Sequence, residues 1–225
     1  MASRPTIVLT HGAFHTGDCW DLLVAELDGR GFDTRTFDLP LTDLDADAAA
    51  VTAVLDECDG PVTLVGHSYG GAVITAAGSH PSVGRLVYLC ALAPDVGEPA
   101  SGGPVEIGPD FLASMRVTDD GVAFVDPALA PQVFYPDVDP ATARRFAQHL
   151  RPGNTGGEVT MTNAAWRDRP ATYIVCVDDP IILETSQRAN AARIGAEVRE
   201  LPGDHSPMVA RPGALADILA EVASR

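Results

Sequence analysis

Short apolar runs alternate with helical patterns along most of this chain of 225 residues. Runs rich in Val, Ile, Leu and Thr, which favour strands, occupy residues 6–10, 34–39, 62–66, 85–92, 172–177 and 197–201. Helical patterns occupy residues 19–31, 46–60, 68–81, 184–196 and 212–225. Strands that alternate with helices form a parallel sheet covered by helices on both faces. The sequence therefore predicts an α/β fold with a mostly parallel sheet of about six strands, in a single domain over residues 1–225.

The alternation is interrupted between about residues 94 and 163. This stretch is dense in Pro and Gly and holds one clear helical pattern, at residues 140–150. A segment inserted at the carboxyl edge of a parallel sheet would lie over the crevice where ligands bind in such folds. We therefore expect a small cap insertion at about residues 95–163, with an irregular surface excursion as the alternative.

The chain is acidic, with a formal net charge of −16, and contains no lysine. Nucleic acids and anionic membranes bind basic patches, so neither is an expected partner. No apolar run approaches the ~20 residues of a membrane span. The first residues enter a strand pattern without the long apolar stretch of a signal peptide, so we expect a cytoplasmic protein. The lack of lysine excludes Schiff-base and lysine-base chemistry.

The cysteines show no spacing typical of a metal site or a disulfide framework. Cys19, Cys58, Cys90 and Cys176 form no CxxC pair and no Cys/His pattern. The histidines of the loop after the first strand also lack a carboxylate or cysteine cluster that would complete a metal shell. We expect no metal and no cofactor. The sequence leaves the oligomeric state open, with a homodimer as one option.

Ser68 lies in the segment LVGHSYGG, residues 64–71, directly after an apolar strand run and before a helical pattern. Residues 66–70 fit G-x-S-x-G, in which a serine sits on a sharp strand-to-helix turn that tolerates only small neighbours. The N-terminus of the following helix would offer N–H groups to a developing oxyanion. The pattern predicts that Ser68 is a nucleophile.

A serine hydroxyl needs an adjacent base at neutral pH. His205, in the segment LPGDHSPM, follows the last strand run and is expected at the same sheet edge as Ser68. We therefore predict that His205 is the base. His11 fits better as a residue that shapes the loop after the first strand, whereas His80 and His149 fit surface or helix-end positions.

The base in turn needs a carboxylate that fixes its tautomer. Asp178 and Asp179 both end the strand run TYIVCV, and the chain order serine, aspartate, histidine is that of the α/β-hydrolases. Asp95, which follows another strand run, is a further candidate. From the residues alone, all three aspartates remain open.

The loop after the first strand can complete an oxyanion hole. In HGAFHTGDCW, Gly12 allows close approach of the backbone, and the Ala13 N–H can pair with that of Tyr69. Side chains that could line a substrate pocket, although each aromatic fits the core equally well, are those near this loop and in the expected cap: Gly12, Phe14, Phe111, Phe134, Tyr135, Trp166 and Met208.

Four segments together resemble the α/β-hydrolase branch that contains plant methylesterases and hydroxynitrile lyases with their bacterial relatives. They are HGAFHTGDCW, LVGHSYGGAVI, TYIVCVDDPIILETSQR and LPGDHSPM, and the likeness covers about residues 5–94 and 164–225. The resemblance implies a triad of Ser68, His205 and an aspartate three residues after a cysteine. Counted from Cys176, that aspartate is Asp179. It also implies an oxyanion hole from the backbone of residues 13 and 69.

The resemblance also bears on the reaction. Lyases of this branch carry a threonine where this chain has Gly12 and a lysine where it has Ser206. Both lyase features are missing, which favours hydrolysis of a small carboxylic ester through an acyl-enzyme. Two alternatives remain: a cofactor-free lyase, cyclase or oxygenase of aromatic or polyketide compounds on the same scaffold, and a non-catalytic binder of small ligands.

Overall fold

The computed structural model describes residues 4–103, 105–154 and 158–225. Within that part of the chain, six strands form one sheet in the order β2-β1-β3-β4-β7-β8. All neighbouring strands of this sheet run parallel. The strands are β1 (Thr6–Thr10), β2 (Asp33–Thr36), β3 (Val62–His67), β4 (Val83–Leu89), β7 (Ala171–Cys176) and β8 (Glu197–Leu201). The predicted six-stranded parallel sheet is confirmed.

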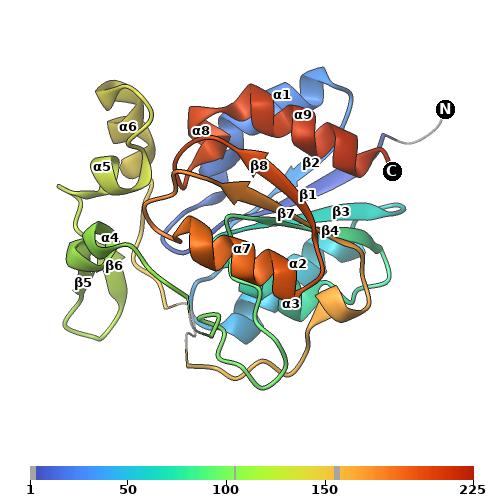
Figure 1. Ribbon diagram of the computed structural model, residues 1–225, viewed down its shortest axis with the longest axis horizontal. Coiled ribbons are helices and arrows are strands. Elements are labelled where there is room, and N and C mark those ends of the chain that lie inside the picture. Colours follow the sequence, from blue (N-terminus) through green and yellow to red (C-terminus); the bar gives the residue numbers. More distant parts are fainter. Residues whose placement is uncertain (1–3, 104, 155–157) are drawn as a thin grey trace.

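Helices cover both faces of the sheet, as the alternating pattern predicts. Helices α1 (Asp21–Gly29) and α9 (Pro212–Ala223) contact one another over one face. Helices α2 (Leu44–Asp56), α3 (Gly70–Ala77) and α7 (Glu184–Arg193) lie on the other face, as Figure 1 shows. The two short elements η1 (Gly17–Trp20) and α8 (Pro207–Ala210) lie near α1 and α9. The central strands β1 and β3 are buried along their whole length because helices cover both their faces.

The second strand is shorter than the sequence predicts. The apolar run suggests residues 34–39, but β2 ends at Thr36. Leu39 is fully buried, yet its N–H donates to His11 Nε2 at 2.9 Å instead of to a neighbouring strand. The apolar pattern therefore predicts one strand over residues 34–39, although the last three of these residues belong to the loop after β2.

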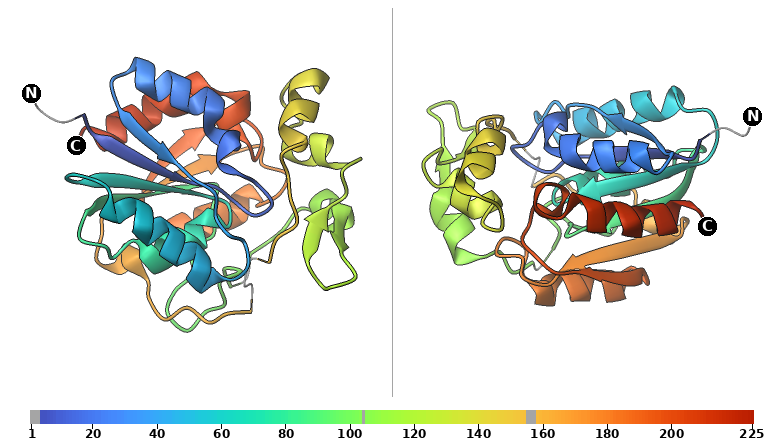
Figure 2. Two further views of the ribbon diagram at one scale, coloured as in Figure 1. Left: turned by 180° about the vertical axis from the view of Figure 1, so that it is seen from behind. Right: turned by 90° about the horizontal axis from the view of Figure 1, so that it is seen from above.

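Residues 90–170, which connect β4 to β7, will be called the inserted segment. They hold α4 (Pro109–Ser114), the antiparallel pair β5 (Met115–Val117) and β6 (Ala123–Val125), α5 (Ala130–Phe134), α6 (Pro140–Ala147) and η2 (Ala165–Arg167). Elements α4 to α6 lie beyond one end of the sheet, on the side away from both termini (Figures 1 and 2). Helix α6 matches the predicted pattern at residues 140–150. The shorter elements of this segment were not predicted.

Among the helices of the described residues, none is long and apolar enough to cross a membrane.

Candidate active site

Ser68 occupies the sharp turn between β3 and α3. Its φ is +54°, a left-handed value that is costly for a residue with a side chain. The turn is fixed by the backbone of Ser68, whose N–H donates to Leu89 O at 3.2 Å and whose carbonyl accepts from Leu92 N at 3.0 Å. The strained conformation presents a half-buried serine at the carboxyl end of β3.

The glycines on both sides of Ser68 are sterically required. A Cβ atom on Gly66 would lie 2.5 Å from the carbonyl oxygen of Gly70. A Cβ atom on Gly70 would lie 2.6 Å from the carbonyl oxygens of Thr10 and His11. The G-x-S-x-G pattern therefore lets the turn pack directly on itself and on the end of β1.

His205 and Asp179 are joined by a buried hydrogen bond. Nδ1 of His205 lies 2.7 Å from Oδ2 of Asp179, and the two side chains are 1% and 0% exposed. The carboxylate can only accept, so the imidazole proton resides on Nδ1. Nε2 is thereby left with a lone pair, which is the form that a general base requires.

His67, the neighbour of Ser68 in the chain, connects this pair to the serine turn. Nε2 of His67 donates to the carbonyl oxygen of His205 at 2.7 Å, and the two rings lie 4.7 Å apart. The Sγ atom of Cys90 donates to the same carbonyl at 3.6 Å. Burial raises the pKa of Cys90 well above its usual value, so this thiol keeps its proton. The loop of His205 is thus fixed against the end of β3.

The two other candidate aspartates lie elsewhere. Asp178 is exposed. Asp95 forms a two-pronged ion pair with the guanidinium of Arg167, at 2.9 and 2.8 Å. The hydrogen bonds from Arg167 lower the pKa of Asp95. Of the three candidates, the described structure brings only Asp179 into contact with His205.

The loop after β1 lies against the serine turn. A Cβ atom on Gly12 would be 2.8 Å from Cβ of Ser68. His11 bridges this loop to the next: its Nδ1 donates to Gly12 O at 2.8 Å, and its Nε2 accepts from Leu39 N at 2.9 Å. Burial lowers the pKa of His11 to about 4, so it stays neutral and supports the loop.

The two expected oxyanion donors come from these neighbouring turns. Among the described residues, neither the Ala13 N–H nor the Tyr69 N–H has a hydrogen-bond partner. The Tyr69 side chain points away, since its hydroxyl donates to Oδ2 of Asp47 at 2.8 Å in the buried interface with α2. Main-chain N–H groups without a partner are the kind of donor that stabilises an oxyanion.

A series of ring contacts leads from His67 into the inserted segment. His15 meets His67 edge-on at 5.8 Å between ring centres and Phe134 at 4.9 Å. Phe134 in turn contacts Phe111 at 5.9 Å. Burial lowers the pKa of His15 to about 3, and His67 shifts in the same direction for the same cause. These histidines are therefore neutral and pack as aromatic residues.

The remaining expected pocket residues are placed as follows. Tyr135 and Met208 are buried, and Tyr135 contacts His15 at 6.1 Å between ring centres. Phe14 is buried in the loop after β1, with φ at +65°. The indole of Trp166 donates to the carbonyl of Pro94 at 2.9 Å, and no contact in the described chain joins it to Ser68 or His205.

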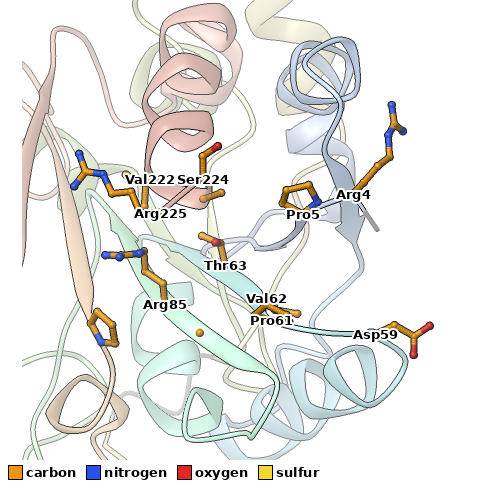
Figure 3. Close-up of a pocket in the computed structure, with 13 residues that line it drawn as sticks. Arg4, Pro5, Asp59, Pro61, Val62, Thr63, Arg85, Val222, Ser224 and Arg225 are labelled. Atoms are coloured by element: carbon orange, nitrogen blue, oxygen red, sulfur yellow. The ribbon is translucent and has the colours of Figure 1, made fainter. Parts of the chain in front are cut away.

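One cavity lies at the opposite, amino edge of the sheet. It measures about 580 Å³ and none of the expected site residues line it. In Figure 3 the side chain of Arg4 points away from this cavity. The side chain of Arg225, which also lines the cavity, forms ion pairs with Glu197 and Glu221. Another cavity, of about 410 Å³, is lined by Pro180 and Ile181, which directly follow Asp179, together with residues of the inserted segment.

One group of side chains in the described residues has the proximity that a metal site requires. Ligand atoms of His67, Cys90 and His205 all lie within 4.8 Å of one another. Each of these side chains already has a hydrogen-bond partner: His67 and Cys90 donate to the carbonyl of His205, and His205 donates to Asp179. The hydrogen bonds account for the group, and we assign no metal to it.

Comparison with known proteins agrees with this geometry. Residues 7–218 match the Alpha/beta hydrolase family. The chain belongs to this family. The pyrethroid hydrolase of Sphingobium wenxiniae is 29% identical to this α/β-hydrolase over 249 residues, which cover 96% of the chain and 87% of the relative. Methylesterase 7 of Arabidopsis thaliana is 25% identical over 258 residues, with 99% and 98% covered. The resemblance noted in the sequence is confirmed.

A solved structure supports the same assignment for the fold. The pyrethroid hydrolase from Sphingobium faniae superposes on this α/β-hydrolase with a TM-score of 0.81 and 26% identity, over 97% of both chains. The similarity therefore extends through the inserted segment, where the sequence resemblance is weakest.

Proposed function

We propose that this α/β-hydrolase cleaves a small carboxylic ester through an acyl-enzyme on Ser68. The observation that carries the proposal is the buried 2.7 Å hydrogen bond between His205 and Asp179, held against the serine turn by His67. His205 Nε2 takes the proton of the Ser68 hydroxyl as its oxygen attacks the ester carbonyl. The Ala13 and Tyr69 N–H groups stabilise the oxyanion, His205 protonates the leaving alcohol, and an activated water then releases the acid.

Two features support hydrolysis over lyase chemistry. A Cβ atom at position 12 would collide with Ser68 Cβ at 2.8 Å, so this backbone accepts only glycine where the lyases carry threonine. Position 206 holds a serine whose buried hydroxyl has no partner in the described chain, where the lyases carry a lysine. The names of the relatives, a pyrethroid hydrolase and a methylesterase, agree with an ester substrate.

The inserted segment is proposed to act as a cap. Its aromatic rings, among them Phe134 and Phe111, would form the apolar wall that contacts the substrate.

Free cysteines at positions 19, 58, 90 and 176 support a reducing compartment such as the cytoplasm.

The test is labelling and turnover with the full chain. Wild-type protein is expected to hydrolyse p-nitrophenyl acetate and to react with a fluorophosphonate probe, whereas Ser68→Ala abolishes both. Ser82→Ala, at a half-buried position just before β4 and therefore at the opposite sheet edge, is the matched control and should keep both activities. Undiminished labelling of Ser68→Ala would overturn the assignment of the nucleophile.

A further inference from the structure

Gln187 is a fully buried polar side chain on α7, whose other residues are polar or alanine. Its neighbour Arg188 is exposed and binds Glu184 and Glu200 at 2.7 Å each. Burying an amide is costly unless every donor and acceptor is satisfied. The contacts of Gln187 therefore indicate why this side chain points inward.

The amide of Gln187 binds the chain on both sides of Asp179. Its Oε1 accepts from Cys176 N at 2.9 Å. This bond fixes the orientation of the amide, because a flipped amide would place its own NH₂ donor against the Cys176 N–H donor. Its Nε2 donates to Ile182 O at 2.7 Å and to Oδ2 of Asp179 at 3.0 Å, with a longer contact to Cys176 O at 3.2 Å. One side chain thus closes the loop 176–182.

The Asp179 carboxylate is consequently held from four directions. Oδ1 accepts from the N–H groups of Ile181 and Ile182, at 2.7 and 3.1 Å. Oδ2 is shared by His205 Nδ1 at 2.7 Å and Gln187 Nε2 at 3.0 Å. Within the described residues, Gln187 is therefore the only side chain besides His205 that donates a hydrogen bond to this carboxylate.

We propose that Gln187 is a positioning residue that orients Asp179 toward His205, an inference that rests on the proposed function. If the Gln187 amide is removed, Asp179 Oδ2 loses the second donor that restricts rotation of its carboxyl group. The loop 176–182 also loses the hydrogen bonds that join its two ends. The carboxylate would then bind His205 with a wider range of geometries. The tautomer and orientation of the base, on which transfer of the Ser68 proton depends, would be less well defined.

The experiment compares Gln187→Met and Gln187→Glu with the wild type. Methionine keeps the length of the side chain but removes every hydrogen bond. Glutamate keeps an acceptor for Cys176 N while placing a second carboxyl group against Asp179. Ser186→Ala is the matched control, because Ser186 is a buried neighbour on the same turn whose hydroxyl, within the described part of the chain, bonds to Glu106 N alone, at 2.7 Å.

The expected result is a fall in kcat of roughly 10- to 100-fold for both Gln187 variants, with KM little changed. The acid limb of the kcat/KM profile should move to higher pH in both variants. In Gln187→Met the Asp179 carboxylate has one donor fewer, and in Gln187→Glu a second carboxyl group lies beside it. Both changes favour the imidazolium form of His205. The control should retain the wild-type kcat and profile even if its melting temperature falls.

A spectroscopic reading separates this inference from the proposed function. The proton shared by His205 Nδ1 and Asp179 gives a far-downfield NMR resonance whether or not the protein turns over an ester. In folded Gln187→Met or Gln187→Glu this resonance should shift or broaden, and in Ser186→Ala it should not. A wild-type resonance and wild-type kcat in both Gln187 variants would overturn the positioning role. If the wild type shows no esterase activity, only the proposed function is refuted.

Discussion

Asp179 Oδ2 and His205 Nδ1 lie 2.7 Å apart, although 26 residues separate them in the chain. They meet because β7 and β8 are parallel neighbours, so the loops after both strands leave the sheet at the same edge. Both side chains are almost completely buried, which shields the interaction from water.

Replacement of Asp179 should remove most of the catalytic rate. In Asp179→Asn the amide cannot hold the Nδ1–H tautomer of His205, and we expect kcat to fall roughly 10⁴-fold with little loss of folding. The controls are Asp178→Asn, an exposed neighbour, and Asp95→Asn, which breaks only the partly exposed pair with Arg167. Ester turnover by the three variants decides the assignment, and a larger loss in either control would contradict it.

The hydroxyl of Tyr69 should matter for stability more than for chemistry. Burial raises the pKa of Asp47, and the hydrogen bonds from Leu41 N and Tyr69 oppose this shift. Tyr69→Phe leaves that fully buried carboxyl group with one donor fewer, at a cost of about 1–3 kcal/mol of unfolding free energy. Its main-chain N–H is kept, so kcat should fall far less than in Asp179→Asn.

Tyr88→Phe is the matched control for this prediction. Tyr88 is also fully buried, but its hydroxyl pairs with the neutral Thr75 hydroxyl at 2.9 Å. A neutral partner is less costly to leave unpaired. Chemical denaturation should therefore show a larger loss for Tyr69→Phe than for Tyr88→Phe, and equal losses would argue against a charged Asp47.

Much of the sheet and of its carboxyl edge could be predicted because the sequence patterns that indicate them are local. The apolar runs of β1, β3, β4 and β7 are buried on both faces, so the strands are visible without knowing their partners. The elements α4, β5, β6 and α5 are three to six residues long and lie in a stretch rich in Pro and Gly. Elements this short contain too few residues for a helical or strand period to be recognised. Packing between distant parts of the chain defines these elements instead.

Two supporting residues had no detectable signal in the sequence. Gln187 belongs to ETSQRANAAR, where nearly every residue is polar, so the pattern does not tell which side faces the sheet. Asp47 lies in an alanine-rich helix beside Asp45, and only the fold shows that one is buried and the other exposed. Both act through hydrogen bonds to residues outside their own helices, which periodicity does not encode.

Gly12 should be intolerant of even one added carbon. A Cβ atom there would lie 2.8 Å from Ser68 Cβ and 3.1 Å from His67 Nδ1, so Gly12→Ala has to displace the serine turn. We expect a loss of kcat of at least roughly 10-fold, since a misplacement of about 1 Å can cost 10²-fold. Gly29→Ala, at the end of α1 with open space around it, is the control and should be neutral or slightly stabilising. Equal activity of the two variants would refute the close packing.

The buried histidines should make the fold sensitive to mild acid. Burial lowers the pKa of His11 to about 4 and of His15 to about 3, and it lowers that of His67 as well. A histidine whose pKa is depressed on folding binds a proton more readily in the unfolded chain. Its stabilising contribution is therefore complete above the ordinary value of about 6.5 and is lost as the pH falls toward the folded value, at about 1.4 kcal/mol per pH unit.

This pH dependence can be assigned by comparing two variants. His15→Phe keeps an aromatic ring against Phe134 but removes one titrating group, so its unfolding free energy should fall less steeply than that of the wild type between about pH 6.5 and 5. Tyr88→Phe is the control, because it removes a buried hydroxyl and no histidine. Its slope should match the wild type. Denaturant titrations across this range measure all three slopes, and identical slopes for His15→Phe and the wild type would mean that folding does not lower the pKa of His15.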